Sequence, residues 1–502
     1  MNLVLPGGFI VHLKAMQLND ADIHKIKERD LDPNRFVQHL QQILRSISPT
    51  KIEKPCIIGD GIESLSPIEC NHYIEIYQQN KSLQKSIFIP ASGAATRMFK
   101  HLSAIQAFDT DTLAEEFIIR FKEFPFYQNL LQLFADHGMN LESMANNDQW
   151  SDILTFISDE IKFTQLPKAL IPFHQTADGQ RTALEEQIRE GLTYIENEDL
   201  SYHFHFTISP DIEHLFSQAK ENVMQHFSGV NLNITFSFQD PSTDTPALKG
   251  ENNFARDKNN EIIFRPAGHG ALIKNLHYQT SDLVFIKNID NIAHEKWTSQ
   301  ITFYKKVLGG LMIDLMNKTH QLLKDLEADG KSALPTAIEF LYKQYGYRSI
   351  EEPTVGQVYA ALNRPIRVCG MVRNEGEPGG GPFWVLHSNG QISKQIVEKS
   401  QIDTADEEQA VHLSTSTHFN PVDIVCCIKD HNGNKFDLTK FIDHSTSFIS
   451  DKFQEGQIIK ALELPGLWNG SMAGWNSVFV EVPTQTFHPV KTVNDLLRPG
   501  HK

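Results

Sequence analysis

One stretch, residues 85–100, restricts the possible folds more than any other part of the chain. Ile87 to Ile89 is a short apolar run typical of a buried strand. The small residues Ala91-Ser-Gly-Ala94 follow, and from there apolar residues recur at helical spacing. A strand, a small-residue turn and a helix in this order direct free backbone N–H groups at a phosphate, and Arg97 would add a guanidinium. The same layout also occurs in turns that bind nothing, and this stretch alone leaves both interpretations open.

Composition limits the classes of protein to which the chain can belong. Its 502 residues, 40% hydrophobic and 22% charged, are typical of a soluble globular protein of one large domain or two to three smaller ones. No apolar run approaches the ~20 residues that cross a membrane. The net charge of −16 argues against nucleic-acid binding, which needs a basic surface. A small phosphorylated substrate is still compatible, because a few lysines and arginines can dominate one cleft.

The cysteines and the first residues of the chain give information about the cellular compartment of the protein. There is no paired spacing among the five cysteines, which are Cys56, Cys70, Cys369, Cys426 and Cys427. We interpret Cys426-Cys427, in an apolar run, as buried thiols, which fits a cytoplasmic protein. Residues 1–15 lack the charge and the cleavage site of a signal peptide, and an ordinary helix start follows Met16. We hypothesise that Met16 is the natural first residue.

Helical patterns dominate two segments near the start of the chain. Residues 16–85 are polar and helical, and we expect them to pack outside the main sheet. Residues 103–163 form either a helical insertion or a lid over a site. Pro167-Lys168 comes next, where a lysine held by a proline could reach a phosphate or could be a solvated loop charge.

Three strands are predicted in the middle of the chain, at residues 202–209, 234–240 and 283–286. His203 and His205 share one face of the first strand, but no third metal ligand is spaced nearby. The last strand ends in a polar tip at Asp290-Asn291. Ligands of open α/β sheets bind at the carboxyl ends of strands, so this carboxylate is a suitable ligand for Mg²⁺.

The part of the chain after residue 350 is less regular. Residues 364–384 place a glycine cluster between two strand-like segments, and this pattern predicts a hairpin. Its charged loop is either a flexible surface turn or a contact for a phosphorylated or polyhydroxylated ligand. Polar residues lie among aromatic ones around Asn420 and Asn469, as in sugar-binding walls and equally in core turns. Lys491 follows a proline and precedes a helical segment.

Taken in order, these motifs resemble those of the UTP-dependent sugar-1-phosphate nucleotidyltransferases, the UDP-sugar pyrophosphorylases. Ala91-Ser-Gly-Ala-Ala-Thr-Arg-Met98 is similar to their glycine-rich Gly-Thr-Arg signature, and Pro167-Lys168 resembles the Pro-Lys element that follows it. Pro266-Ala-Gly-His-Gly270 with Lys287-Asn-Ile-Asp-Asn291 resembles their Pro-Gly-His-Gly and Asn-x-Asp-Asn pair. Phe487-His-Pro-Val-Lys-Thr-Val-Asn-Asp-Leu-Leu497 is similar to their Pro-Val-Lys-Thr-x-x-Asp-Leu-Leu element.

The whole chain also resembles a family of bacterial proteins labelled domain of unknown function 4301. The shared stretches are Pro90-Ala-Ser-Gly-Ala-Ala-Thr-Arg97 and Leu467-Trp-Asn-Gly470. Together the resemblances imply an α/β fold: a GT-A-like, Rossmann-like nucleotide-diphospho-sugar transferase core with a mixed sheet. They imply an N-terminal helical segment (1–85), the core with its helical insertion (86–350), and an α+β C-terminal part (351–502) that completes the sugar and phosphate site.

The resemblance also implies roles for individual residues. Arg97, Lys168 and Lys491 would be catalytic, and Asp290 would ligate Mg²⁺. The implied nucleotide-binding residues are Ser92, Gly93, Ala94, Ala95, Thr96, Gln239, Gly268, His269 and Gly270. The possible sugar-binding residues are Arg373, Glu375, Asn420 and Asn469.

The implied reaction joins an NTP, with UTP the first choice, to a sugar 1-phosphate and releases pyrophosphate. The sugar phosphate already carries a nucleophilic oxygen, so positioning and cationic stabilisation are the main demands on the protein. Ser92 and Ala95 stand where the family pattern has glycine, and a long helical segment separates Arg97 from Lys168. These departures keep two alternatives open: a nucleotide-binding protein on a degenerate transferase scaffold, and a GT-A glycosyltransferase. The sugar and the oligomeric state are not encoded in any motif of the sequence.

Overall fold

The computed structural model describes residues 18–44, 49–102, 112–160, 162–177, 179–250, 253–348, 352–377, 379–387, 390–454 and 457–502. The hypothesis about Met16 and the start of the predicted insertion, residues 103–111, lie outside these ranges. Within them, no helix combines the length and the apolar character needed to cross a bilayer.

The helices and strands are as follows. The helices are α1 (Asp20–Glu28), α2 (Pro33–Leu44), α3 (Pro67–Gln79), α5 (Thr112–Ile119), α6 (Tyr127–Asp136), α7 (Leu141–Asn146), α8 (Trp150–Thr155), α9 (Ala183–Gly191), α10 (Glu213–His226), α11 (Ile273–His277), α12 (Thr298–Ala328), α13 (Gly330–Phe340), α14 (Val355–Leu362) and α15 (Glu407–Ser414). The longer strands are β1 (Ile52–Pro55), β4 (Lys85–Pro90), β5 (Pro172–Thr176), β6 (Gly179–Thr182), β7 (Ser201–Ile208), β8 (Asn231–Phe238), β13 (Leu283–Lys287), β14 (Ile366–Arg373), β15 (Gly380–Leu386), β16 (Ile392–Glu398), β17 (His418–Cys427), β18 (Phe448–Gln454), β19 (Gln457–Glu463) and β20 (Asn476–Glu481). The short strands are β2 (Ile57–Ile58), β3 (Gly61–Glu63), β9 (Thr245–Pro246), β10 (Leu248–Lys249), β11 (Asn253–Phe254) and β12 (Phe264–Arg265).

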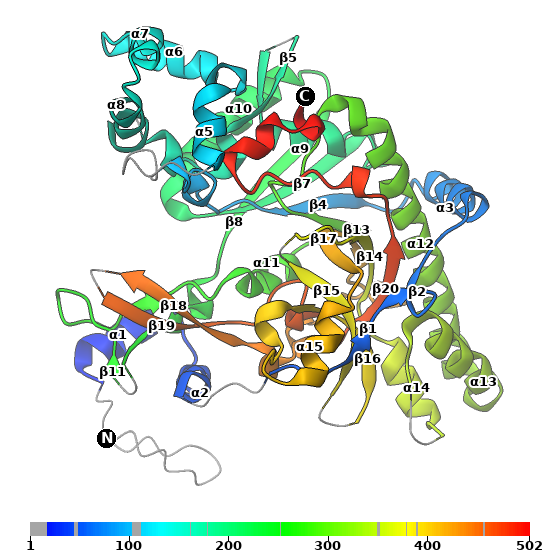
Figure 1. Ribbon diagram of the computed structural model, residues 1–502. Coiled ribbons are helices and arrows are strands. Elements are labelled where there is room, and N and C mark those ends of the chain that lie inside the picture. Colours follow the sequence, from blue (N-terminus) through cyan, green and yellow to red (C-terminus); the bar gives the residue numbers. More distant parts are fainter. Residues whose placement is uncertain are drawn as a thin grey trace.

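A mixed sheet of nine strands runs through the molecule in the order β2-β3-β20-β14-β17-β13-β4-β7-β8 (Figure 1). Only β17 runs against its neighbours, β13 and β14, and the other pairs within this sheet are parallel. Helices connect the parallel strands, as in Rossmann-like folds. The predicted α/β class with a mixed sheet is therefore confirmed.

The order of the parallel strands creates a switch point between β4 and β13. The chain moves outward from β4 to β7 and β8, and then returns to place β13 on the other side of β4. The connections that leave β4 and β13 consequently diverge, and this divergence opens a crevice at the carboxyl edge of the sheet. The loop after Pro90 and the loop after Lys287, both quoted above for their motifs, meet at this crevice.

Both faces of the sheet are buried, as the alternation of side chains along β4 shows. Ile87 and Ile89 belong to the larger hydrophobic core, together with residues of α9, α12 and the segment 112–163. Phe88, between them, belongs to a second core that includes residues of α11 and of the segment 467–475. Burial on both faces explains why these strands appear in the sequence as continuous apolar runs.

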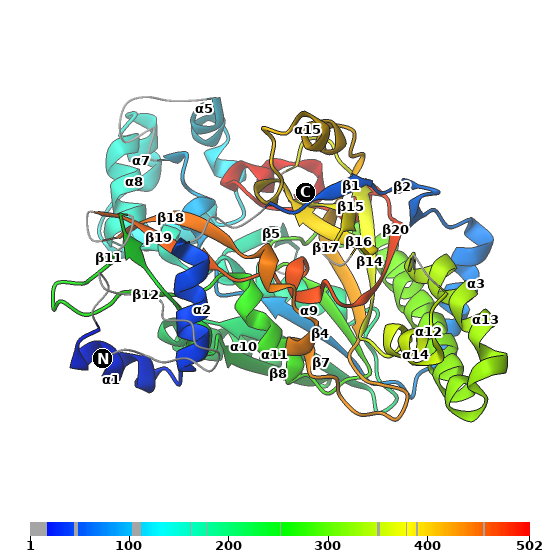
Figure 2. The ribbon, with the colours of Figure 1, turned by 90° about the horizontal axis from the view of Figure 1, so that it is seen from below.

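The predicted helical insertion is confirmed in its described part, which contains α5 to α8. Figure 1 places these helices beside the C-terminal end of the chain, and Figure 2 separates them from the group formed by α12, α13 and α14. Asn494 near the C-terminus donates from its amide nitrogen to the carbonyl oxygen of Leu113 (2.7 Å) and to the carboxylate of Glu116 (3.0 Å). The insertion is thus attached to the same C-terminal segment that carries Lys491.

Three local expectations differ from the structure. Residues 16–85 are not wholly helical or outside the sheet, because β2 and β3 extend its edge next to β20. Strands β14 and β15 do not form a hairpin: β14 lies between β17 and β20, whereas β15 pairs with β1 and β16 in a separate three-stranded sheet. Where the sequence predicts the start of a helix at Ala94, the structure has a 3₁₀ turn, Ala95–Arg97. Local pattern does not specify a strand's partner when both faces of each strand are buried.

The free cysteines agree with the sequence-based interpretation. All five are buried and unpaired, and Cys426 and Cys427 lie within β17. Burial raises the pKa of the Cys427 thiol to about 11, so it stays protonated at neutral pH.

The contact between α3 and α12 generates a stability prediction. A side chain at Gly310 of α12 would overlap the carbonyl oxygen of Tyr73 in α3, whereas one at Gly356 of α14 meets no atom within 4 Å. We expect Gly310→Ala to lower the melting temperature, because overpacking costs about 1–3 kcal/mol and a backbone carbonyl cannot turn away. The matched variant Gly356→Ala should leave the melting temperature unchanged or raise it, because alanine favours a helix. Equal effects of the two substitutions would contradict the close approach of α3 and α12.

Candidate active site

The loop after β4 is fixed by backbone bonds to the Pro167-Lys168 segment. The N–H of Ala95 donates to the carbonyl of Leu166 (2.9 Å), and the N–H of Lys168 donates to the carbonyl of Gly93 (3.0 Å). Ala94 and Pro167 form an antiparallel bridge. The two motifs are therefore in direct contact, although the helical insertion separates them in sequence.

This fixation leaves three consecutive N–H groups of the loop free. Ser92, Gly93 and Ala94 are exposed, and their N–H groups make no hydrogen bond within the part of the chain that the structure describes. Thr96 and Arg97 are also exposed, while Ala95 is buried. A row of free N–H groups can bind an anion. The helix N-terminus expected to support them is reduced to one 3₁₀ turn, so the anion-binding capacity depends on the loop itself.

Asp290 lies between two lysines from distant parts of the sequence. Its Oδ2 accepts from Nζ of Lys168 (3.0 Å) and from Nζ of Lys491 (3.1 Å), and we call these three residues the lysine–aspartate junction. The side chains of Asp290 and Lys168 are only 12% and 14% exposed, whereas that of Lys491 is 48% exposed. Burial alone would raise the pKa of Asp290, but the charges of Lys491 and Lys168 outweigh it and hold that pKa below its ordinary value. The carboxylate is therefore ionised at neutral pH.

The C-terminal segment that carries Lys491 is held to the loop after β13. The N–H of Val490 donates to the carbonyl of Asp290 (2.9 Å), and the N–H of His488 donates to Oδ1 of Asn291 (3.0 Å). The carboxylate of Asp495 accepts from the N–H groups of Lys491 and Thr492, both at 2.7 Å. The backbone on both sides of Lys491 is thus ordered before any ligand binds.

A side chain of helix α9 forms hydrogen bonds with the backbone of the same loop. Gln187 is fully buried, and its amide nitrogen donates to the carbonyls of Asn288, Ile289 and Asn291 at 3.0 to 3.3 Å. This side chain satisfies three carbonyls of the irregular backbone around Asp290, which would otherwise lose hydrogen bonds on burial.

Four buried charges form two ion pairs beneath the junction. Lys287 of β13 pairs with Glu190 of α9, and Asp423 of β17 pairs with Lys305 of α12. Lys287 and Asp423 lie opposite each other in the sheet. Burial lowers the pKa of Lys287 to about 8, although Glu190 acts in the opposite direction. The two pairs tie α9 and α12 to the strands that end at the crevice.

The glycines of the Pro266–Gly270 motif serve packing within the protein. A side chain at Gly268, where φ is +76°, would meet Oε2 of Glu463 at 2.8 Å, and one at Gly270 would overlap the carbonyl oxygen of Pro465. The ring of His269 stacks on Trp468 with 4.3 Å between centroids, and its Nδ1 accepts from the N–H of Leu467 (3.0 Å). Burial lowers the pKa of His269, so its imidazole is neutral at pH 7.

Gln239, the last predicted nucleotide-binding residue, lies after β8. Its amide nitrogen is 3.3 Å from the hydroxyl of Thr243 and 3.4 Å from the carboxylate of Asp244. Strands β8 and β4 are parallel members of the same sheet, so Gln239 lies at the crevice edge on the far side of β7. Its role in binding stays a prediction.

The four possible sugar-binding residues lie in three different places. Asn469 is buried and donates to Glu398 (2.8 Å), whose carboxylate is 3.9 Å from Nε2 of His269. Asn420 is buried in β17, three residues before Asp423, and therefore at the carboxyl edge of β13. Arg373 and Glu375 are exposed, and Nε of Arg373 is 3.7 Å from Glu481. The structure joins Asn469 to the His269 motif and separates Arg373 and Glu375 from it.

Reasoning from the sequence missed Gln187, Glu190, Lys305 and Asp423. Asp423 had a detectable signal, because it is one charge inside the otherwise apolar run 421–428. A charge in such a run is rarely buried without a partner. The other three residues lie on helices with many polar residues, and no periodicity marks them.

The metal-binding capacity of the site rests on one carboxylate. Oδ1 of Asp290 is buried and has no hydrogen-bond partner among the described residues. In the same part of the chain, no three His, Cys, Asp or Glu side chains gather as a metal-binding group. Mg²⁺ is commonly held by one or two carboxylates together with substrate phosphates and water, so the residues present fit a Mg²⁺ ion shared with a bound phosphate.

The junction generates a prediction about stability. We expect Asp290→Ala to destabilise the protein by about 3–5 kcal/mol, because it leaves the buried ammonium of Lys168 without its counter-ion. Lys491→Ala should cost only about 0–1 kcal/mol, because that side chain is half exposed and Asp290 keeps Lys168 as a partner. Urea unfolding of the two variants at pH 7 measures the difference. If the two unfolding midpoints shifted equally, the buried pair of Asp290 with Lys168 would be refuted.

Comparison with solved structures finds distant likenesses. A mutant of UDP-glucose pyrophosphorylase from Leishmania major, in complex with UDP-glucose, shares 14% identity, with a TM-score of 0.45 over 96% of this chain and 79% of that one. The UDP-glucose phosphorylase from Trypanosoma brucei shares 11% identity, with a TM-score of 0.47 over 95% and 77%. A putative UDP-N-acetylglucosamine pyrophosphorylase from Entamoeba histolytica shares 11% identity, with a TM-score of 0.44 over 86% and 85%.

Two comparisons concern the sequence alone. A search of curated proteins finds no match. The profile of one protein family, described as "Domain of unknown function (DUF4301)", matches residues 19–502. That match spans nearly the whole chain and includes every motif discussed above, so this protein belongs to the DUF4301 family.

Proposed function

We propose that this chain is a Mg²⁺-dependent nucleotidyltransferase that joins an NTP, with UTP as the first candidate, to a sugar 1-phosphate and releases pyrophosphate. The observation that carries the proposal is the meeting of two lysines and one carboxylate at the switch point of the sheet. Lys168 and Lys491 are 122 and 201 residues from Asp290 in sequence, yet both bind the same oxygen of that residue. Lys168 is also bound to the loop that carries the free N–H groups of Ser92, Gly93 and Ala94, because its own N–H donates to the carbonyl of Gly93.

The proposed reaction requires cations at fixed positions more than it requires a base. An oxygen of the sugar phosphate forms a new bond to the α-phosphorus of the NTP, and the bond from that phosphorus to the pyrophosphate oxygen breaks. No proton needs to be removed from the attacking oxygen, so a strong general base is not required. The barrier comes from bringing two polyanions together, and fixed cations lower it.

In the proposed complex, the N–H groups of Ser92, Gly93 and Ala94 bind the phosphates of the NTP, and exposed Arg97 adds a guanidinium at the same loop. Lys168 has little freedom to move, because it also donates to the carbonyl of Val490 (2.9 Å) and is mostly buried. It would therefore act as a fixed charge near the α-phosphorus. Lys491 is half exposed and can turn from Asp290 toward the sugar phosphate.

Asp290 would hold Mg²⁺ through Oδ1, its oxygen without a hydrogen-bond partner among the described residues. Bound there, the ion would neutralise charge that develops on the phosphate oxygens. Its other oxygen, Oδ2, would stay hydrogen-bonded to the two lysines. Asp290 would thereby position both the metal ion and the two ammonium groups around the phosphates.

A second function is favoured by one feature of the junction. Asp290 engages both lysines at 3.0 and 3.1 Å, so phosphates must compete with a carboxylate for their charge. A protein that binds nucleotides or nucleotide-sugars without turnover needs less cationic stabilisation than a pyrophosphorylase does. The same experiment distinguishes the two functions.

The experiment measures pyrophosphate release from UTP, and from the other NTPs, with a panel of sugar 1-phosphates and Mg²⁺. We expect Lys168→Ala and Lys491→Ala each to lower kcat about 100- to 1000-fold, as loss of a fixed transition-state charge does. Lys440→Ala is the matched control, because it removes one charge that is 76% exposed and lies outside the junction. Asp290→Asn should raise the Mg²⁺ concentration required for half-maximal rate.

Three other outcomes would contradict the proposed function. Binding of UTP or a UDP-sugar without pyrophosphate release would favour the non-catalytic protein. Transfer of a sugar from a UDP-sugar to an acceptor would favour a glycosyltransferase. Full activity of both lysine variants would refute the assignment of the junction as the active site.

A further inference from the structure

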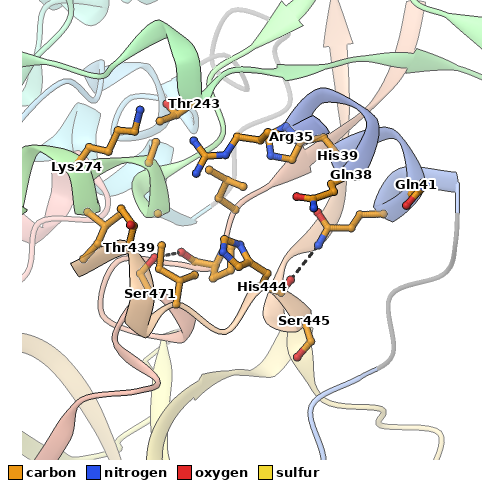
Figure 3. A pocket seen from close by; sticks show the side chains of 17 residues that line it. Arg35, Gln38, His39, Gln41, Thr243, Lys274, Thr439, His444, Ser445 and Ser471 are labelled. Atoms are coloured by element: carbon orange, nitrogen blue, oxygen red, sulfur yellow. Dashed lines mark hydrogen bonds between the residues drawn. The ribbon is translucent and has the colours of Figure 1, made fainter. Parts of the chain in front are cut away.

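A cavity of about 460 Å³ lies apart from the lysine–aspartate junction. It is formed by α2, by the residues that begin α11, and by the segments 439–445 and 464–471 (Figure 3). None of Arg97, Lys168, Asp290 or Lys491 is among its 17 lining residues. Its size is in the range of pockets that hold small molecules.

The lining is cationic in a chain whose net charge is −16. Its two permanent charges, Arg35 and Lys274, are both positive, and no Asp or Glu is among the 17 residues. Two histidines, His39 and His444, also line it. We call it the cationic cavity. Figure 3 shows Arg35 extending from α2 into the space between Lys274 and His444. A pocket without carboxylates in an acidic protein favours anions.

The two permanent charges of the cavity differ in their partners. Lys274 is neutralised by Asp240 at 2.8 Å, and its Nζ also donates to the hydroxyl of Ser242 (2.6 Å). The guanidinium of Arg35 forms no ion pair with any described residue. Arg35 therefore supplies a positive charge that a ligand can neutralise.

His39 is the second group without a partner. It is 4% exposed, and its Nδ1 has no hydrogen-bond partner among the described residues. Burial, and next the charges of Arg35 and His444, lower its pKa to about 4. A neutral imidazole still donates one hydrogen bond, and leaving it unpaired in a buried site is costly.

We propose that the cationic cavity binds a small phosphate ester through Arg35 and His39. A guanidinium fork pairs with two phosphate oxygens, and the imidazole N–H reaches a third. The exposed amide of Gln38 is a further donor. Ile273, Ile442 and Leu464 provide apolar surface for the organic part of the ligand.

The cavity adjoins the proposed nucleotide site and shares Gly270 with it. Gly270 and Ala271 line the cavity, and they follow directly on Gly268 and His269. Gly270 packs against Pro465 so closely that a side chain would overlap the carbonyl oxygen. A ligand in the cavity therefore contacts the same rigid segment that carries His269.

The test uses the full chain with Lys168→Ala and Lys491→Ala as the parent, so that phosphate binding at the junction is removed. The probe is inorganic phosphate at constant ionic strength, with acetate as the carboxylate comparison, and the readout is the melting temperature. Ligand that binds only the native state raises this temperature. We expect phosphate to raise it, acetate to raise it less, and Arg35→Gln to weaken the apparent phosphate affinity about tenfold or more.

Two further variants make the result specific. His39→Leu, which removes the imidazole donor, should weaken phosphate binding as well. Lys440→Ala, which removes an exposed charge next to the lining residue Thr439, should not. Each variant is first compared with the parent in the absence of phosphate, so that a loss of folding is recognised. No phosphate-dependent shift in the parent, or the same shift in Arg35→Gln and the parent, would overturn the proposal. Neither result bears on pyrophosphate release by the natural chain, so the proposed function is judged separately.

Discussion

The carboxylate of Asp290 is the interaction on which the organisation of the crevice depends. Three chain segments converge on it: the loop after β13, the Pro167-Lys168 segment and the C-terminal segment with Lys491. Without that charge, neither lysine would have a counter-ion among the residues that the structure describes. The hydrogen bond from the N–H of Lys168 to the carbonyl of Gly93 then connects these segments to the loop after β4. One ionised side chain thus aligns the two loops that the strand order brings to the switch point.

Burying a carboxylate together with two lysines costs free energy of desolvation. The surrounding protein adds hydrogen bonds and ion pairs that hold the loop of Asp290 in place. Gln187 satisfies the carbonyls next to Asp290, and the pairs Lys287–Glu190 and Lys305–Asp423 lie beneath. Buried pairs of this kind contribute little net stability compared with apolar residues. Their geometric effect is larger, because each pair connects a strand of the crevice to a helix on the sheet. We attribute the fixed position of the Asp290 loop to these connections.

Much of the fold was predictable, and the reason is visible in particular strands. The runs at Ile87–Ile89 and Leu283–Ile286 are buried on both faces, so their sequence alone marks them as strands. The motifs at Lys168, Asp290 and Lys491 were predicted as parts of one site, and the structure brings them together. Partner choice was not predictable: the pattern indicates a hairpin of β14 and β15, but each pairs with strands that are remote in sequence. The 3₁₀ turn after Ala94 was also missed, since the apolar residues Met98 and Phe99, whose spacing indicates a helix, are buried directly after a turn of only three residues.

The pattern of charge connects the two anion-binding regions. In both, the protein places cations where no carboxylate offsets them fully: the lysines outnumber Asp290 at the junction, and Arg35 is unpaired within the described part of the cavity lining. At Lys287 and Lys305, by contrast, each buried cation is matched by one carboxylate. Positive charge that the protein's own carboxylates leave unbalanced is a charge that a bound anion can neutralise. At this edge of the sheet, the balance of charge around a lysine distinguishes the proposed binding site from the structural ion pairs, because lysines occur in both.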